Sequence, residues 1–251
     1  ISYDQLLKGA AGVAVALEEQ NIQPGSVVIL VLQHSQALVY SFYGAILHGA
    51  IPSIMPFLTE KLSPEKYQAD IRALVRITQP AAILTEPAFL SLMQQIAGPE
   101  TSVHAVIDIT TCSPALSLPN HDRLRGLGRS PQDIVLLQHS SGTTGLQKGV
   151  ALSNQAVIRQ VDTYSAELRL VKDDVIVSWL PLYHDMGLIA GFLLPVISGV
   201  PLVLMSPFDW VRAPHRLLQA VSTYKGTLTW LPNFAYNFCA KQIRERDIVA
   251  V

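Results

Sequence analysis

The sequence predicts an α/β fold of two stacked, largely parallel sheet-and-helix subdomains. Short apolar runs alternate with segments of helical periodicity along all 251 residues, and this alternation favours parallel strands joined by helices that cover both faces of a sheet. Hydrophobic residues make up 49% of the chain and charged residues 15%, so a large core can be buried. A stretch at 110–132 that is rich in Pro, Gly, Ser and other polar residues predicts a boundary between residues 1–130 and 131–251.

The first half opens with an apolar stripe of helical spacing behind Ser2, a residue suited to cap a helix. The next run, at 27–32, is apolar and β-branched, as expected for a strand that is covered on both faces. Gly49 is expected to end the following helix, and Pro64 fits the first turn of another. The further elements expected here are helices at 36–48, 63–78 and 87–96, and strands at 51–55, 81–84 and 103–107.

The second half opens with a strand at 134–137 that runs into a glycine-rich loop and a second strand at 150–152. Ser153 or Asn154 is expected to cap a long helix that reaches Leu168. Beyond it the alternation continues, with strands expected at 175–179, 202–205 and 227–231. Helices are expected near 185–194, at 213–224 and from Phe234 onward.

Charge and cysteine content exclude several classes of partner and site. The net charge is -1 and no run of basic residues stands out, so nucleic acid and anionic membrane surfaces are poor partners. Cys112 and Cys239 are too few and too far apart for a disulfide framework or a paired-cysteine metal site. We therefore expect a reducing, cytoplasmic location. The chain begins without Met and without a signal peptide, which suggests an excised fragment.

A stretch at 187–205 carries no charge and approaches the length that spans a bilayer. Pro195, Gly199 and Pro201 interrupt it, so it is expected to form a helix, a turn and a short buried strand. Stable membrane insertion is therefore not expected.

The strongest chemical motif is the run SSGTTGLQKG at 140–149. Its three glycines let the backbone approach a ligand closely, and its hydroxyls, backbone N–H groups and Lys148 suit a polyphosphate. The spacing fits neither the Walker P-loop nor the GxSxG nucleophile elbow. On residue types alone, a surface loop with a hairpin turn is an equally good interpretation, although its place after a buried strand favours a ligand site.

At this point the chain resembles the adenylate-forming superfamily, whose phosphate loop is similar to LLQHSSGTTGLQKGV at 136–150. The superfamily comprises acyl-CoA synthetases, fatty acyl-AMP ligases, luciferases and the adenylation domains of peptide synthetases. One departure is Gln147, where the family usually has Pro. The next family motif is similar to SWLPLYHDMGL at 178–188, and the wall of the acyl pocket to LPNFAY at 231–236. The resemblance covers essentially the whole chain, is specific from about Gln138 onward, and is closest to the fatty acyl-AMP ligase and acyl-CoA synthetase branches.

The resemblance implies an N-terminal domain fragment of an AMP-forming acid ligase. Such an enzyme uses ATP and Mg²⁺ to turn a carboxylic acid, here a long-chain fatty acid, into an acyl-adenylate. It then passes the acyl group to coenzyme A or an acyl carrier protein. By the resemblance, Lys148 and His184 are catalytic, Thr144 contacts the metal, and His184, Asn233 and Phe234 bind substrate. The residues implied to hold ATP are Ser140, Ser141, Gly142, Thr143, Thr144, Gly145 and Lys148.

Single residues of these motifs also have structural interpretations. A lone histidine such as His184 is more often structural than catalytic. The resemblance reverses this and makes His184 a positioning group, because a substrate carboxylate is already ionised at neutral pH. Asp185 is assigned to capping the next helix. Trp179 and Phe234 are interpreted as core aromatics rather than ligand platforms.

Other functions stay open at this stage. The family's adenine, ribose and catalytic-lysine motifs do not occur in the chain, so the isolated fragment is expected to be inactive. The alternatives are a non-catalytic binding module of the same fold, a ligase for an amino or aryl acid, and an unrelated phosphate-binding α/β protein.

Overall fold

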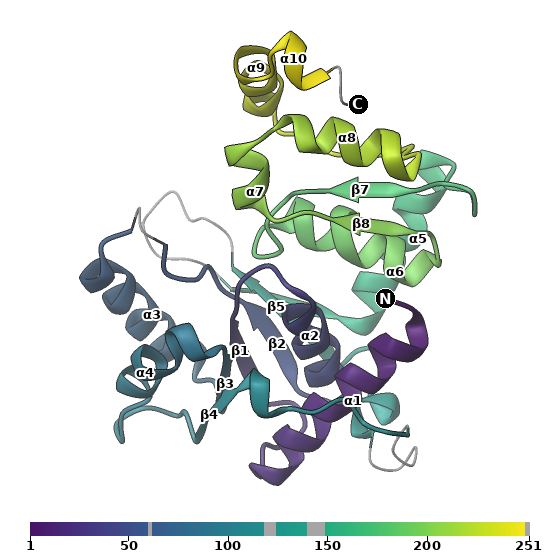
Figure 1. Ribbon diagram of the computed structural model, residues 1–251. Coiled ribbons are helices and arrows are strands. Elements are labelled where there is room, and N and C mark those ends of the chain that lie inside the picture. Colours follow the sequence, from purple (N-terminus) through teal and green to yellow (C-terminus); the bar gives the residue numbers. More distant parts are fainter. Residues whose placement is uncertain (60–61, 118–123, 140–148, 249–251) are drawn as a thin grey trace. The chain divides into compact units, whose positions relative to one another are not determined.

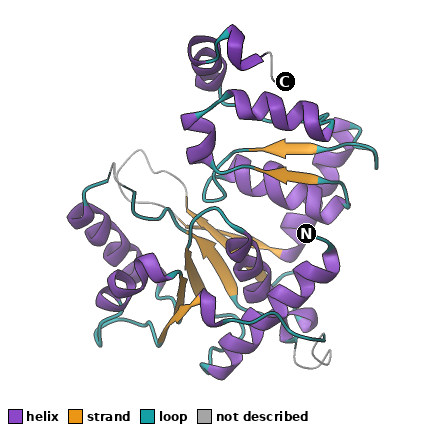
Figure 2. Cartoon of the chain, viewed as in Figure 1, coloured by secondary structure: helices purple, strands orange, loops and turns teal. Residues whose placement is uncertain are grey.

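The structure is a computed structural model that describes residues 1–59, 62–117, 124–139 and 149–248. It divides into two compact units, Ile1–Gln155 and Ala156–Val251. In both units helices flank the strands (Figures 1 and 2). The predicted α/β class with largely parallel sheets is thus confirmed.

A four-stranded parallel sheet forms the centre of the first unit (Figure 1). Its order is β2-β1-β3-β4, so β1 lies inside the sheet and β2 at an edge. Every residue of β1 except the first is buried, which explains its unbroken apolar run. Pro52 is tolerated because β2 has a free ladder side. The strands are β1 (Val27–Val31), β2 (Ile51–Ile54), β3 (Ala82–Thr85) and β4 (Ala105–Asp108).

The strand order fixes which face each connecting helix covers. Across the sheet, the chain moves in one direction from β1 to β2 and in the opposite direction from β2 to β3 and from β3 to β4. Because parallel crossovers are right-handed, α2 (Gln36–His48) must lie on one face, and α3 (Pro64–Thr78) and α4 (Pro87–Ile96) on the other. Figure 1 shows this arrangement, with α1 (Tyr3–Glu19) beside α2.

Local sequence explains where these helices begin and end. Ser2 and Gln5 form a reciprocal capping box at the start of α1. The Ser63 hydroxyl accepts a hydrogen bond from the Lys66 N–H at the start of α3. Gly49 ends α2 with a φ of 90°, a left-handed conformation that favours glycine. The face under α3 and α4 is filled by buried residues that include Ile29, Val31, Met55, Tyr67, Ile71, Ile83, Phe89 and Met93.

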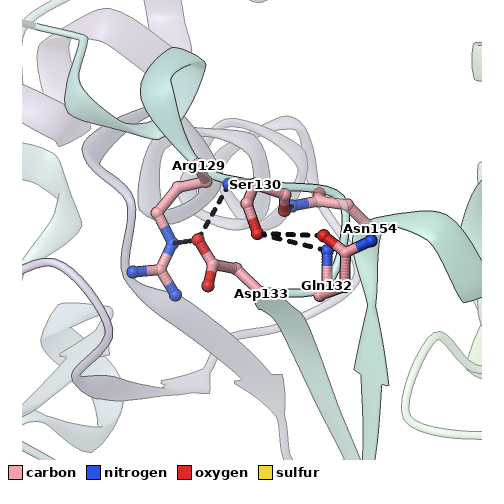
Figure 3. A network of polar contacts seen from close by, with 5 residues as sticks. All are labelled: Arg129, Ser130, Gln132, Asp133 and Asn154. Carbon is pink, nitrogen blue, oxygen red and sulfur yellow. Dashed lines mark hydrogen bonds and ion pairs between the residues drawn. The ribbon is translucent and has the colours of Figure 1, made fainter.

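An antiparallel pair, β5 (Ile134–His139) and β6 (Gly149–Ser153), completes the first unit. The strand β5 lies beside β2. Polar contacts tie the residues before β5 to the residues after β6 (Figure 3). The Arg129 guanidinium lies 3.3 Å from the Asp133 carboxylate, which also accepts the Ser130 N–H, and the Asn154 amide donates to the Ser130 carbonyl. The compact units therefore divide after Gln155, whereas composition places the subdomain boundary after residue 130.

The second unit contains a parallel pair of short strands, β7 (Ile176–Ser178) and β8 (Leu202–Leu204), surrounded by helices (Figure 2). The long helix α5 (Asn154–Leu168) leads into it from the end of the first unit. A π-helix, η4 (Met186–Leu193), continues directly into α6 (Leu194–Ser198). The remaining helices are α7 (Pro207–Arg212), α8 (His215–Tyr224), α9 (Asn233–Gln242) and α10 (Glu245–Ile248).

Three expectations for this unit need correction. The strand expected at 227–231 is reduced to one isolated bridge, from Leu228 to Ile176. The helix expected at 185–194 has π-type hydrogen bonding over most of its length. The helix α7 was not expected, although Ser206 caps it and Pro207 occupies its first turn, which are ordinary helix-start residues.

Among the described residues, no helix is both long enough and apolar enough to cross a membrane. The uncharged stretch at 187–205 instead forms most of η4 and all of α6 and β8.

Three histidines of the first unit are held neutral by burial. Burial lowers the pKa of His34 to about 4 and lowers the pKa values of His48 and His139. In the unfolded chain each imidazole titrates near pH 6.5. As the pH falls below 6.5, these histidines become protonated in the unfolded state but stay neutral in the folded state. The free energy of unfolding must therefore decrease.

We therefore expect the contribution of these histidines to the free energy of unfolding to be complete above pH 6.5 and to decline as the pH falls toward 4. Each such histidine adds a slope of up to about 1.4 kcal/mol per pH unit. Urea unfolding between pH 7.5 and 4.5 measures this slope, and the variant His34→Gln should reduce it. His104 is exposed, so His104→Gln is the matched control. An equal slope in both variants and the wild type would contradict the assignment to His34.

Candidate functional site

The predicted phosphate-binding residues Ser140, Ser141, Gly142, Thr143, Thr144, Gly145 and Lys148 lie outside the described residues. The structure does describe the two residues that flank them. His139 ends β5 and Gly149 begins β6, and the two are paired across the antiparallel ladder. The segment 140–148 therefore starts and finishes at neighbouring points of one hairpin.

His139 is anchored to the parallel sheet of the first unit. Its Nδ1 lies 3.1 Å from the Ser53 hydroxyl of β2, and this hydroxyl donates to the Leu137 carbonyl at 2.7 Å. Both His139 and Ser53 are buried. Sequence reasoning did not single out either residue, although His139 belongs to the run that resembles the family's phosphate loop.

In the second unit, the second predicted motif begins at the carboxyl end of β7. The chain turns after Trp179, and the His184 N–H donates to the Pro181 carbonyl at 3.1 Å. The His184 side chain is exposed and its ring lies 5.1 Å from that of Tyr183. Burial raises the pKa of the Tyr183 phenol. The predicted catalytic histidine is therefore accessible at a strand end, the usual place for ligands in α/β folds.

Asp185 starts the helix that follows, as predicted. Its carboxylate accepts the Met186 N–H at 2.7 Å, which stabilises the amino end of η4. This contact confirms the capping role assigned to Asp185.

Two glycines let η4 pack against the turn and the strand before it. A Cβ on Gly187 would lie 2.1 Å from the Pro181 carbonyl oxygen, and a Cβ on Gly191 would lie 2.5 Å from the Ser178 hydroxyl. No side chain fits at such distances. The position of the turn that carries His184 thus depends on Gly187.

An aromatic cluster lies beside the same strand end. The rings of Trp179 and Trp210 stack with centroids 3.6 Å apart and 14° between their planes. The edge of the Phe234 ring meets both indoles, at 6.5 and 6.4 Å, and Phe238 packs on Trp210. Trp179 is buried, as predicted for a core aromatic. Phe234 is 60% exposed, so its interpretation as a core aromatic is wrong.

Asn233 and Phe234 are the first two residues of α9, and both side chains are exposed. The structure brings Phe234 against Trp179, a residue of the motif that contains His184. Trp210 completes this cluster and was missed in the sequence, because the short helix α7 that carries it was not expected.

Among the described residues, no group of three or more His, Cys, Asp or Glu side chains could hold a metal ion. Thr144, the predicted metal contact, belongs to the segment outside the described residues.

The chain is similar in sequence to known proteins. The sequence profile of a family described as AMP-binding enzyme matches residues 1–249. A long-chain fatty acid–AMP ligase of Mycobacterium marinum is 28% identical over 266 residues, which cover 100% of this chain and 43% of that protein. A medium-chain fatty acid–[acyl-carrier-protein] ligase of Teredinibacter turnerae is 35% identical over 121 residues, which cover 48% of this chain and 19% of that protein.

A solved structure is also similar. The crystal structure of a fatty acyl-adenylate ligase from L. pneumophila in complex with acyl adenylate and pyrophosphate matches with a TM-score of 0.81 and 27% identity. The match covers 98% of this chain and 42% of that chain. The chain therefore spans less than half the length of the curated relatives it matches.

The close approach at Gly187 gives a direct test of the packing around His184. Glycine-to-alanine changes inside helices usually stabilise. Gly187→Ala is instead expected to destabilise by about 1–3 kcal/mol, because backbone must move to admit the methyl group. Thermal unfolding measures the effect. A Cβ on Gly128 would meet nothing within 4 Å, so Gly128→Ala is the control and should stay within about 0.5 kcal/mol. Equal effects would contradict the packing role.

Proposed function

Because the chain belongs to the AMP-binding enzyme family, we propose that it is part of an ATP-dependent ligase that activates a fatty acid as its acyl-adenylate. The observation that carries the proposal is the family match over residues 1–249, together with relatives that are fatty acid–AMP and acyl-carrier-protein ligases. ATP and a carboxylic acid are then the substrates.

In the proposed reaction a carboxylate oxygen attacks the α-phosphate of ATP. A bond forms between this oxygen and the α-phosphorus. The bond between the α-phosphorus and the oxygen that bridges it to the β-phosphorus breaks, and pyrophosphate leaves. Phosphoryl transfer of this kind needs positioning and neutralisation of charge more than covalent help from the protein. The segment from Ser140 to Lys148 would hold the β- and γ-phosphates, and the Lys148 ammonium would balance charge on the leaving group.

The second unit would hold the acid. His184 lies exposed at the turn after β7, where it can position a carboxylate without removing a proton, because the acid is already ionised at neutral pH. Asn233 and Phe234 would contact the acyl group at the start of α9. The apolar surroundings of Phe234, formed by Trp179 and Trp210, suit a hydrocarbon chain.

Mg²⁺ would accompany ATP and neutralise part of the phosphate charge. This ion keeps several waters and binds chiefly to phosphate oxygens, with only one or two protein ligands. Of this chain's own residues, the Thr144 hydroxyl is the proposed contact.

The acyl group would then pass from the adenylate to a thiol. The candidates are coenzyme A and the pantetheine arm of an acyl carrier protein. The similarity to an acyl-carrier-protein ligase supports the second, and the similarity to a putative fatty-acid–CoA ligase of Mycobacterium tuberculosis supports the first.

Lys148 is the sharpest test of the proposed phosphate site. In the full-length enzyme, Lys148→Ala removes one charged contact to the leaving group, which typically slows a reaction about 100-fold to 1000-fold. We expect this loss in adenylate formation, measured as pyrophosphate release. Transfer from a pre-formed acyl-adenylate should be almost unchanged, because pyrophosphate has already left.

Lys172 provides the matched control, because it is an exposed lysine of the second unit. Lys172→Ala should leave both half-reactions near the wild-type rates. Equal losses in both half-reactions of Lys148→Ala would point to a damaged fold instead of a phosphate contact.

Chain-length dependence tests the choice of substrate. Each methylene buried in an apolar pocket contributes about 0.8 kcal/mol, so affinity should rise from acetate toward palmitate until the pocket is full. Pyrophosphate release across this series, with amino acids alongside, is the measurement. An amino acid would need an acidic partner for its ammonium group. Preference for an amino acid, or for acetate over every longer acid, would defeat the fatty-acid assignment and leave only the adenylating reaction.

A further inference from the structure

A chain of two hydrogen bonds fixes the protonation of His139. The Ser53 hydroxyl lies 2.7 Å from the Leu137 carbonyl, and only the hydroxyl can donate in this pair. Its oxygen must therefore accept the second bond, from His139 Nδ1 at 3.1 Å. Neutral imidazole carries one ring proton. The proton is thus on Nδ1, and Nε2 carries a lone pair.

The Nε2 atom of His139 has an unusual environment. His139 is 8% exposed, and its Nε2 is buried without a hydrogen-bond partner among the described residues. This atom faces Gly149, because a Cβ built on Gly149 would lie 3.5 Å from it. Burial lowers the pKa of His139, which keeps the imidazole neutral and its lone pair available at pH 7.

Packing alone does not account for this arrangement. A buried acceptor that lacks a donor is destabilising, and a phenylalanine or leucine would fill similar space without that penalty. The Ser53 bond also holds the ring in one orientation, with Nε2 directed at the point where the chain re-enters the hairpin. A buried, oriented and unpaired acceptor indicates a partner that is supplied when a ligand binds.

We infer that His139 is a positioning residue for adenylate formation: Ser53 orients its ring, and Nε2 accepts a hydrogen bond from an N–H group in the nucleotide-bound enzyme. This inference rests on the proposed function. His139 directly precedes the segment proposed to hold the phosphates, and Gly149 directly follows it.

Side-chain replacements in the full-length enzyme separate the two ring nitrogens. His139→Phe removes both, His139→Asn keeps a donor near the Nδ1 position, and His139→Gln keeps a polar atom near the Nε2 position. His139→Phe should lower kcat for adenylate formation about tenfold, the effect of one ordinary hydrogen bond. His139→Gln should recover most of this loss and His139→Asn little of it. Transfer from a pre-formed acyl-adenylate should be unchanged in all three.

Coupling between the two residues is the second test. Ser53 orients His139 and also bonds the Leu137 carbonyl, so Ser53→Ala should lower the same kcat, and the double variant Ser53→Ala/His139→Phe should lose less than the two single losses combined. Additive losses, equal losses in both half-reactions, or wild-type rates in His139→Phe would overturn the inference. Failure of the proposed function is distinguishable, because the wild-type enzyme would then release no acid-dependent pyrophosphate at all.

A spectroscopic measurement keeps the inference testable if a variant does not fold. In wild-type enzyme labelled with ¹⁵N at histidine, the His139 resonances should show a proton on Nδ1 and a bare Nε2. Addition of Mg²⁺ and ATP should move the Nε2 resonance in the direction of an acceptor that has gained a hydrogen bond. A proton on Nε2 before addition, or no change after it, would count against the assignment.

Discussion

The hydrogen bond from the Ser53 hydroxyl to the Leu137 carbonyl joins the β5–β6 hairpin to the parallel sheet of the first unit. The strand β2 is an edge strand, and an edge needs a neighbour that protects it without extending the ladder. The strand β5 lies there, held through a side chain instead of a full set of backbone pairs. Since the segment proposed to bind phosphate lies between β5 and β6, this one contact relates its base to the rigid sheet.

In each unit, residues of proposed function come directly after a strand. His139 ends β5 and is followed by the glycine-rich segment, and Trp179 follows β7, five residues before His184. Strand ends suit this purpose because a hydrogen-bonded ladder limits how far the following residues can move. The π-helix η4 also restrains the turn that carries His184. Gly187 and Gly191 bring it against Pro181 and Ser178, so the turn with His184 is held by a strand before it and a helix after it.

Helices and strands that begin or end at characteristic residues could be predicted from the sequence. Features that depend on contacts with residues distant in the sequence could not. The bounds of α2 and α4 were predicted correctly because Gly49 and Pro87 are explicit stop and start residues. The strand expected at 227–231 depends on partners, and Leu228 finds only a single bridge to Ile176. The apolar, uncharged run at 187–205 predicts a helix here but does not specify the π-type bonding of η4. For the site, the motifs identified His184, Asn233 and Phe234, but only coordinates reveal that Phe234 is exposed and that Trp210 stacks on Trp179.

The geometry of that stack also limits what the aromatic cluster can do. Two indoles that are nearly parallel at 3.6 Å oppose their ring quadrupoles, which prefer offset or edge-to-face contacts. The pair is therefore held by the burial of both rings, at 4% and 1% exposure, and by the attachment of Trp210 to α7. Both indole N–H groups are buried without partners among the described residues, so the stack has no polar bond that would favour a different arrangement. Because both indoles are buried, Phe234 is the ring of these three that presents apolar area to solvent. The three rings carry no charge, so a charged group would have to be recognised by residues outside them, a role proposed for His184.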